Sequence, residues 1–561
     1  MFLHIKLCRA VHRLGVGLAA CIALVASPWA LADFGLTTST DYYTVDTGAG
    51  LIFKILRQDG GSNTRSPGDI ASLVIDGVEY EQPNRGSQIN SGFDYLYTSD
   101  SSVSLSAQQV NSQTIKITVT AGHLTHYYMA RRGERRIYMA TYFTEEPTTM
   151  GLVRFILRMQ YDRLPHGPEP ADISQTVSTV EAHDIFALAN GETRSKHYSN
   201  HRLMDWKYIG GTGNHIGIWV VRDNGEGGSG GPFYRSLLNQ VTAHANEITY
   251  IVNYNEAQTE ALRTHVLNAY TLVVTDGSAP STNIDTSWFS QMSLLGYVPD
   301  SQRGRVAGVG INGMDSDYQY TVGFANSRAQ YWTHPSSSGY FSLDRMLPGT
   351  YTMTIYKNEL AVHTQSITVS AGSITSLHTI TITGDPSQQS AIFRVGHWDG
   401  TPTEFLNGDK VTTMHPSDVR MANWSTPTWT AGSSSSRDFP AYIWKDVNNG
   451  RQISFRLSNS QRQSAHTVRV GITVAYANAR PIIKVNDWQS SVPAISQQPS
   501  TRTLTIGTYR GNNHTYEFTV PASAWNTQSS WNTLTISAAS GSGGSQYLSA
   551  GFSVDCIDLL N

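Results

Sequence analysis

Apolar and polar residues alternate at every second position through most of this sequence, and this feature restricts the fold more than any other. Clear examples are residues 113–121 (QTIKITVTA), 351–356 (YTMTIY), 379–383 (TITIT) and 502–507 (RTLTIG). A period of two predicts half-buried antiparallel strands. Long stretches with the helical period of 3.6 are absent from the sequence, and Gly and Ser interrupt the chain at short intervals. We therefore expect an all-β fold.

Changes in composition along the chain divide it into regions. A broad first region, residues 33–299, is followed by a compact block, residues 300–384, which suits a fibronectin- or immunoglobulin-like sandwich of about 100 residues or fewer. A polar connector then leads into residues 385–561, whose strands predict a jelly-roll β-sandwich. We expect three domains with these boundaries.

The first residues have the pattern of a secretory signal peptide. Three basic residues precede an apolar run at residues 14–26, and Ala30-Leu31-Ala32 follows it as a small-residue cleavage motif. The run is shorter than the roughly 20 apolar residues that a membrane-spanning helix needs. We expect residues 1–32 to be removed, and a secreted protein, extracellular or periplasmic, without a membrane anchor.

The cysteine content and the net charge limit the disulfides and the binding partners that we expect. Two of the three cysteines lie in the expected leader, so the mature chain keeps Cys556 and forms no intramolecular disulfide. We expect Cys556 to be a small apolar residue in a terminal strand. The formal net charge of −3, with 15% charged residues, argues against a nucleic-acid partner, which normally requires a basic face. We expect a monomer.

The first of three polar segments that could carry chemistry is residues 152–160 (LVRFILRMQ). On a strand, Val153 and Phe155 would share one face, while Arg154 and Arg158 would share the other. The cationic face could be a solvated surface with ion pairs. It could also be the floor of a groove that binds a carboxylate, because guanidinium matches that group with two hydrogen bonds.

The second segment is residues 191–199 (GETRSKHYS). If it is extended, Arg194, Lys196 and Tyr198 lie on one side. A nearby guanidinium and partial burial would favour the neutral amine of Lys196, which could then act as a base. The alternative is an exposed lysine without a catalytic role.

The third segment is residues 249–260 (TYIVNYNEAQTE). It begins with strand-like alternation at Tyr250, Val252, Tyr254 and Glu256, and then turns polar. The structural alternative is a strand that ends in a surface loop.

Together with further motifs, these segments resemble the rhamnogalacturonan lyases of polysaccharide lyase family 4, from about Phe34 to the C-terminus. The resemblance implies a large catalytic β-sandwich related to the galactose-mutarotase fold, a fibronectin-like module and a galactose-binding-like jelly roll. The further motifs are YMATY (138–142), GGPF (230–233), AQYWT (329–333), VGHWDGTP (395–402), MHPSDVRM (414–421) and DC (555–556).

The family's activity, by resemblance, is β-elimination at a galacturonate of rhamnogalacturonan I, a uronate-containing polysaccharide. Such a reaction needs a cation for the carboxylate, a base for the C5 proton and an acid for the leaving oxygen. The resemblance implies that Lys196 is catalytic and that Arg154 binds substrate, with Arg194, Tyr198 and Tyr254 as further candidate contacts. Elimination of this kind requires no cofactor, and calcium is a candidate structural ion in the C-terminal sandwich.

One motif departs from the family pattern. The family reads N-S-G-H-x-Q-T-E where this chain reads NYNEAQTE at residues 253–260, so Glu256 replaces the catalytic histidine. Thr249 and Ile251 stand where tyrosines are expected. Either catalysis is lost, leaving a glycan-binding protein, or the site is retuned with Glu256 as the acid.

The identity of the proton donor stays open at this stage. Tyr254, His197 and His244 are alternatives to Glu256. A glycoside hydrolase would instead need two carboxylates about 5 to 10 Å apart, for which Glu256 and Glu260 are the pair that the sequence offers.

Overall fold

The computed structural model describes residues 34–58, 65–97, 102–148, 152–199, 201–253, 260–507, 512–540 and 544–561. Within these ranges the chain forms β-strands and no α-helix, which confirms the all-β class. None of the helical turns described there is long and apolar enough to cross a membrane. The expected signal peptide lies outside the described residues. The helical turns are short 3-10 segments: η1 (Phe93–Tyr95), η2 (Glu169–Ala171), η3 (Lys196–Ser199), η5 (Ser287–Gln291), η6 (Asp300–Gln302), η7 (Pro386–Gln388), η8 (Ser436–Asp438), η9 (Gln461–Gln463), η10 (Ala522–Ala524) and η11 (Gln546–Leu548).

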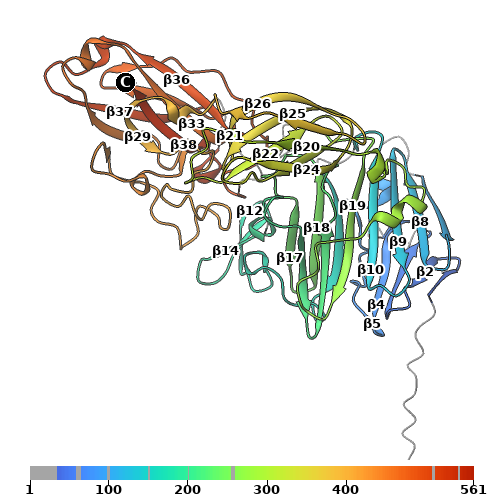
Figure 1. Ribbon diagram of the computed structural model, residues 1–561. Helices are drawn as coiled ribbons and strands as arrows, with labels where there is room; N and C mark the ends of the chain where they lie inside the picture. The colour runs from blue at the N-terminus through green and yellow to red at the C-terminus, as the bar shows by residue number, and fades with distance from the viewer. Residues whose placement is uncertain are drawn as a thin grey trace, which may run out of the picture.

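The N-terminal domain contains antiparallel sheets of five, seven, four and three strands (Figure 1). The five-stranded sheet has the order β1 (Gly35–Thr38), β2 (Tyr42–Asp46), β3 (Leu51–Leu56), β4 (Ile70–Ile75), β5 (Val78–Glu79). The seven-stranded sheet has the order β15 (Tyr208–Gly213), β16 (Ile216–Arg222), β19 (Leu267–Thr275), β10 (Arg136–Phe143), β9 (Leu124–Arg131), β8 (Thr114–Ala121), β7 (Val103–Gln109). The two smaller sheets are β17 (Leu237–Val241), β18 (Ala245–Asn253), β11 (Val153–Gln160), β6 (Gln88–Ile89), and β12 (Ser178–Glu181), β13 (Ile185–Ala187), β14 (Thr193–Arg194).

The middle domain is a smaller sandwich that follows directly. One sheet has the order β24 (Phe341–Met346), β20 (Gly304–Gly308), β27 (Ile374–Leu377), and the other β23 (Gln330–Thr333), β22 (Tyr320–Ala325), β25 (Gly349–Lys357), β26 (Leu360–Val369). A short parallel pair, β21 (Ile311–Asn312) and β28 (Ile380–Thr381), accompanies them.

The C-terminal domain is a sandwich of two further sheets. The first has the order β29 (Ala391–Gly396), β38 (Gly551–Leu560), β33 (His466–Tyr476), β36 (His514–Val520), with β31 (Tyr442–Trp444) also paired to β38. The second has the order β30 (Trp429–Thr430), β32 (Arg451–Arg456), β37 (Trp531–Ala539), β34 (Arg480–Val485), β35 (Trp488–Gln489).

The period-2 pattern sets which side chains form the cores. On β8, Ile115, Ile117 and Val119 are buried, and on β25 Tyr351 and Met353 are buried between threonines that are exposed or half-buried. Apolar clusters of this kind fill each of the three domains. The boundaries expected at residues 299 and 384 remain predictions.

Residues 502–507 correct one expectation. The alternation there predicted a strand, but the segment forms a turn in which the amides of Thr505 and Ile506 bond back to the carbonyl of Arg502. Thr503 and Leu504 are each 1% exposed, so both the polar and the apolar positions are buried. The alternation misleads because this turn is enclosed between two domains instead of lying in a sheet.

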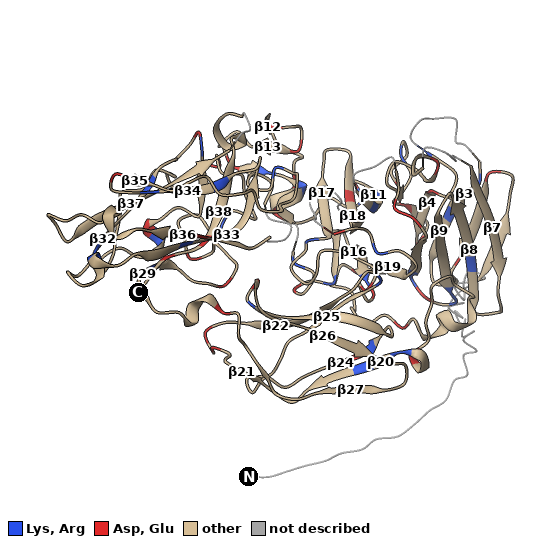
Figure 2. Ribbon diagram, turned by 90° about the horizontal axis from the view of Figure 1, so that it is seen from above, with Lys and Arg blue, Asp and Glu red and all other residues tan. Residues whose placement is uncertain are grey.

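The three domains touch one another. In Figure 1 the middle domain lies between the other two, and in Figure 2 the hairpin β12–β13 of the N-terminal domain lies beside strands of the C-terminal domain. The ribbon in Figure 2 also shows that basic and acidic residues are interspersed along the described chain. The C-terminal domain therefore adjoins the part of the N-terminal domain that carries the lysine segment.

Candidate active site

The four-stranded sheet of the N-terminal domain packs one face on the core and turns the other away from it. On β11, Phe155 belongs to the core, and the neighbouring Arg154 lies on the outer face, as expected. Across the sheet Arg154 pairs with Ile251 of β18, so both side chains share that face. The backbone N–H of Arg154 donates to Asn90 Oδ1 at 2.8 Å, and its side chain is half-buried. A guanidinium is thus fixed to a rigid strand on the outer face.

Arg158, four residues further along β11 on the same face, has a different role. It is 1% exposed, and its Nη1 donates to the carbonyl of Gly86 at 2.6 Å. Its Nε lies 3.5 Å from Glu247. Burial, with the nearby charge of Arg85, lowers the pKa of Arg158 to about 10. Arg158 therefore supports the sheet, and the cationic floor expected on this strand is reduced to Arg154.

Lys196 opens the 3-10 turn η3, so the segment is extended at β14 (Thr193–Arg194) but not through Lys196 and Tyr198. The hydroxyl of Ser195 accepts the amide of His197 at 3.2 Å, and such local side-chain bonds favour turns over strands. The turn packs on edge strand β17, where the amide of Asn239 donates to Ser199 Oγ at 2.9 Å. The three side chains expected on one side are therefore separated.

Tyr198 ties this turn to two other parts of the molecule. Its ring is buried in an apolar cluster that includes Ile251, the cross-strand partner of Arg154. The turn that carries Lys196 therefore lies over the same outer sheet face as Arg154. The hydroxyl of Tyr198 donates to the carbonyl of Thr505 in the C-terminal domain at 2.5 Å. That hydroxyl already has a partner, so a substrate-binding role for Tyr198 remains a prediction that this contact does not favour.

Lys196 is held by a carboxylate that the C-terminal domain also contacts. Its Nζ lies 2.9 Å from Asp184 Oδ1, and the lysine side chain is 27% exposed. The other oxygen of Asp184 lies 2.8 Å from Nη2 of Arg502. Burial alone would raise the pKa of Asp184, but the neighbouring charges of Lys196 and Arg502 outweigh it and hold that pKa below its usual range. The Lys196 amine is therefore accessible to solvent, and its contact with Asp184 fixes its orientation.

His197 connects Lys196 electrostatically with Arg154. The imidazole is buried, and burial, reinforced by the charges of Lys196 and Arg154, lowers its pKa to about 3, although Asp184 opposes this. Both cations thus lie near enough to act on one ring. The structure brings the two residues implied by the family resemblance into one neighbourhood, near the neutral imidazole of His197.

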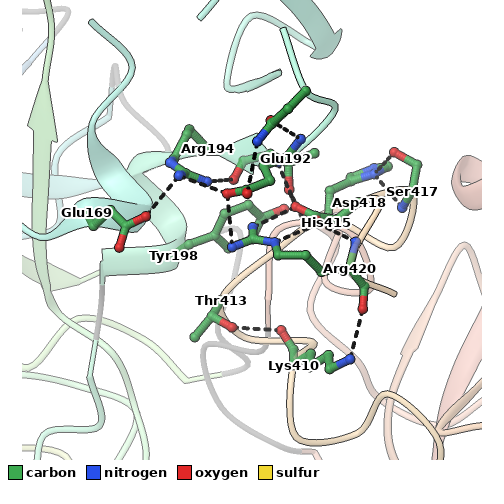
Figure 3. Close-up of polar contacts among 12 residues, drawn as sticks. Glu169, Glu192, Arg194, Tyr198, Lys410, Thr413, His415, Ser417, Asp418 and Arg420 are labelled. Atoms are coloured by element: carbon green, nitrogen blue, oxygen red, sulfur yellow. Dashed lines mark hydrogen bonds and ion pairs between the residues drawn. The ribbon is translucent and has the colours of Figure 1, made fainter. Parts of the chain in front are cut away.

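Arg194 points elsewhere. Its Nη2 lies 3.0 Å from Glu169 and 3.1 Å from Glu192, and its side chain is 7% exposed (Figure 3). Glu192 is in turn 3.3 Å from Arg420 of the C-terminal domain. Arg194 is therefore part of an interdomain network of ion pairs, and its proposed contact with substrate remains a prediction without support from this geometry.

Tyr254 and Glu256 lie outside the described residues, but their attachment point is described. Strand β18 ends at Asn253, which pairs with Val153, the residue before Arg154. Strand β18 therefore ends beside Arg154, and its last residue is the first residue of the altered motif. Glu260, the other half of the hydrolase pair, forms an ion pair with Arg263 at 3.3 Å.

His244 is a poor alternative as proton donor. It precedes β18, seven residues from Ile251, and a strand of that length spans about 23 Å. His244 therefore lies at the far end of the sheet from Arg154. His197 is close by, but its lowered pKa leaves it without the proton that an acid must donate.

Sequence reasoning missed the residues that surround Lys196. Asp184 and Arg502 were not singled out, and Asp418 entered only as part of the motif at residues 414–421. Both Asp418 and Arg502 contact the N-terminal domain. No periodic signal marks such contacts. In the part of the chain that the structure describes, no group of three or more His, Cys, Asp or Glu side chains is arranged to hold a metal ion.

Comparison with known families assigns all three domains. Residues 34–296 match the family described as rhamnogalacturonan lyase B, N-terminal. Residues 302–377 match polysaccharide lyase family 4, domain II, and residues 391–559 match domain III of the same family.

The names of relatives that align along almost the whole chain agree with these family matches. A probable rhamnogalacturonate lyase A of Aspergillus fumigatus is 38% identical over 96% of this chain and 99% of that protein. Rhamnogalacturonate lyase A of Aspergillus aculeatus is 38% identical over 94% of this chain and 96% of its own. A putative rhamnogalacturonase of Neurospora crassa is 38% identical over 95% of this chain and 96% of its own.

The fold and these matches define the class of protein as a polysaccharide lyase. Within that class, the chain belongs to polysaccharide lyase family 4, the rhamnogalacturonan lyases. The resemblance drawn from the sequence motifs is confirmed.

Proposed function

We propose that this protein is a secreted lyase that cleaves a rhamnogalacturonan I-type polysaccharide by β-elimination, with Lys196 as the base. The observation that carries the proposal is the placement of Lys196 and Arg154 over one sheet face, where both charges act on His197. The full-length relatives named as rhamnogalacturonate lyases support the substrate class. The signal-peptide pattern of residues 1–32 supports secretion.

The reaction assigns a task to each group. Arg154 binds the galacturonate carboxylate and neutralises it, which makes the C5 proton more acidic. Lys196 removes that proton as a neutral amine. The electrons of the C5–H bond form a C4=C5 double bond, the C4–O4 bond breaks, and O4 leaves with the electron pair. A proton delivered to O4 completes the rhamnose end, and the other product is a 4,5-unsaturated uronate.

Glu256 is the proposed donor of the final proton. A protonated carboxyl can perform this role where its surroundings raise its pKa. Glu256 follows the last residue of β18 by three positions in the sequence, and β18 ends beside Arg154, which supports this assignment. No metal takes part in these steps, and calcium is retained only as a candidate structural ion of the C-terminal domain.

A second function is supported by the altered motif. Replacement of the family histidine by Glu256, with Thr249 and Ile251 in place of tyrosines, would suit a protein that binds the glycan without cleaving it. Such a protein would keep Arg154 for the carboxylate but lack the acid.

One experiment separates the two functions. Purified protein is incubated with a panel of uronate polysaccharides, and the ultraviolet absorbance of the conjugated uronate is followed. We expect an increase on rhamnogalacturonan I, no increase for Lys196→Ala, and none for Lys196→Arg, which keeps a charge but cannot become a neutral base at neutral pH. Glycan binding without any absorbance change in the native protein would establish the binding function instead.

A further inference from the structure

The hairpin β12–β13 places two carboxylates at the boundary with the C-terminal domain. Glu181 ends β12, and Asp184 precedes β13. Between them Ala182 and His183 have φ values of +50° and +55°. Residues with a Cβ rarely adopt this left-handed conformation, and such conformations cluster where the surroundings impose them. The turn is thus held in a costly shape that directs both carboxylates to the same place.

Arg502 of the C-terminal domain occupies that place. Its Nη1 lies 2.6 Å from Glu181 and its Nη2 lies 2.8 Å from Asp184. Glu181 is 7% exposed and also accepts the hydroxyl of Thr505 at 3.0 Å. His415, from another loop of the same domain, lies 3.2 Å from the second oxygen of Glu181. One guanidinium therefore spans two carboxylates that belong to the N-terminal domain.

Arg502 and Lys196 contact the same carboxylate, that of Asp184. The contacts of the C-terminal domain therefore extend to the catalytic lysine. A second contact acts on the same segment: Thr193, three residues before Lys196, bonds to Asp418 of the C-terminal domain. The lysine segment is therefore fixed to the C-terminal domain on both sides.

We propose that Arg502 is a positioning residue for catalysis, through which the C-terminal domain holds Asp184 and thereby orientates Lys196 and keeps its amine available as a base. The proposal rests on the proposed function, in which Lys196 removes the C5 proton. It makes the C-terminal domain a part of the catalytic apparatus.

The charges around the pair give Arg502 its effect. Asp184 alone would stabilise an ammonium on Lys196. Arg502 and Arg154 oppose this by adding positive charge near the neutral imidazole of His197, and Glu181 is paired with Arg502 and His415. Without Arg502, Asp184 would be paired with Lys196 alone and would stabilise its ammonium more strongly. A cation near an amine favours its neutral form, and an anion favours its charged form.

Two variants of the full chain, Arg502→Gln and Asp184→Asn, test the proposal through the pH dependence of kcat/KM. Arg502→Gln removes a cation and is expected to move the acid side of the profile to higher pH. Asp184→Asn removes a carboxylate and is expected to move it to lower pH. Arg502 and Lys196 are like charges that contact the two oxygens of one carboxylate, and a nearby like charge disfavours the charged form of an amine, so Arg502→Gln should lose about tenfold in kcat at neutral pH with KM retained. Arg502→Lys keeps the charge but cannot span both carboxylates, and should shift the profile less than Arg502→Gln does.

Arg303→Gln is the matched control. It removes a buried interdomain ion pair, that of Arg303 with Glu226 at 2.8 Å, on the boundary with the middle domain. It should lower stability without moving the pH profile. If the profiles of the Arg502 and Asp184 variants coincide with the native one, or shift in the same direction, the positioning role is wrong. If Lys196→Ala keeps its activity, the proposed function itself fails, and that outcome is distinct from the former.

Discussion

The carboxylate of Asp418 accepts hydrogen bonds from both the backbone amide and the hydroxyl of Thr193, at 2.6 and 2.7 Å. The two residues belong to different domains. The same carboxylate is 2.7 Å from Arg420, which itself reaches Glu192 (Figure 3). The C-terminal domain is therefore attached to the lysine segment by charged hydrogen bonds, which are the strong kind.

Replacing Asp418 should destabilise the protein in a pH-dependent way. Burial opposes ionisation, but the hydrogen bonds from Arg420 and Thr193 hold the pKa of Asp418 well below its usual range. Its contribution is therefore complete above the unfolded value near pH 4 and is lost as pH falls through the folded value. Asp418→Asn should cost about 1.5 to 3 kcal/mol at pH 7 by chemical denaturation, and less below pH 4. The exposed Asp487→Asn should change stability by less than about 0.5 kcal/mol, and an equal loss in both variants would contradict the assignment.

Arg154 should act on the charge of the substrate. Arg154→Gln is expected to lower kcat/KM about 10- to 100-fold, because a hydrogen bond to a charged group contributes about 1.5 to 3 kcal/mol. Arg154→Lys should retain more activity than the glutamine variant. The informative comparison is a methyl-esterified substrate, which has no carboxylate charge. If the variant and the native protein differ as much on the ester as on the acid, Arg154 does not bind the carboxylate.

Glu256 can be tested by restoring the residue of the family motif. Glu256→Gln cannot donate a proton and should lower kcat about 100-fold or more, as is usual for removal of a general acid. Glu256→His should retain turnover, because histidine is the residue that the family uses at this position. The measurement is the same absorbance time course at several pH values. Full activity in the glutamine variant would transfer the role to another group, with Tyr254 tested next.

Glu404 should make the C-terminal domain less stable in mild alkali. Burial, with the charge of Asp399 nearby, raises the pKa of Glu404 to about 8. Its Oε1 accepts the amide of His397 at 2.7 Å, while its Oε2 is buried without a hydrogen bond among the described residues. The unfolded chain releases this proton near pH 4 and the folded chain near pH 8, so stability falls between these values.

Glu404→Gln should remove that loss. Its thermal midpoint is expected to exceed that of the native protein at pH 8, with the difference shrinking towards pH 5. The exposed Glu517→Gln serves as the control and should follow the native curve at both pH values. A glutamine variant that is less stable at pH 8 would show that the carboxyl is ionised and paired there.

Much of the fold could be predicted from periodicity, because strand alternation is local. The β11 strand places Phe155 inward and Arg154 outward as the pattern requires, and Tyr250 and Val252 on β18 also enter the core. Cys556 is buried in β38, as expected for a small apolar residue. These outcomes depend on neighbours within a few residues along the chain.

The surroundings of Lys196 could not be predicted in that way. Asp184 and Arg502 are far apart in the sequence and meet only when two domains dock. Residues 502–507 alternate as a strand would, but their threonines are buried. They are buried by contact with another domain, which the alternation does not encode. Ser195 broke the extended segment through a local hydroxyl bond that hydrophobic periodicity does not encode.

Cys556 offers a chemical reporter of domain opening. Although β38 belongs to the C-terminal domain, the thiol packs with Trp398 in the apolar cluster of the middle domain. A thiol reagent can reach it only when that contact loosens, and burial, which raises the pKa of the thiol, slows reaction further. The rate of labelling would therefore measure how often the two domains separate. A bound substrate that makes this separation rarer would slow the labelling of Cys556.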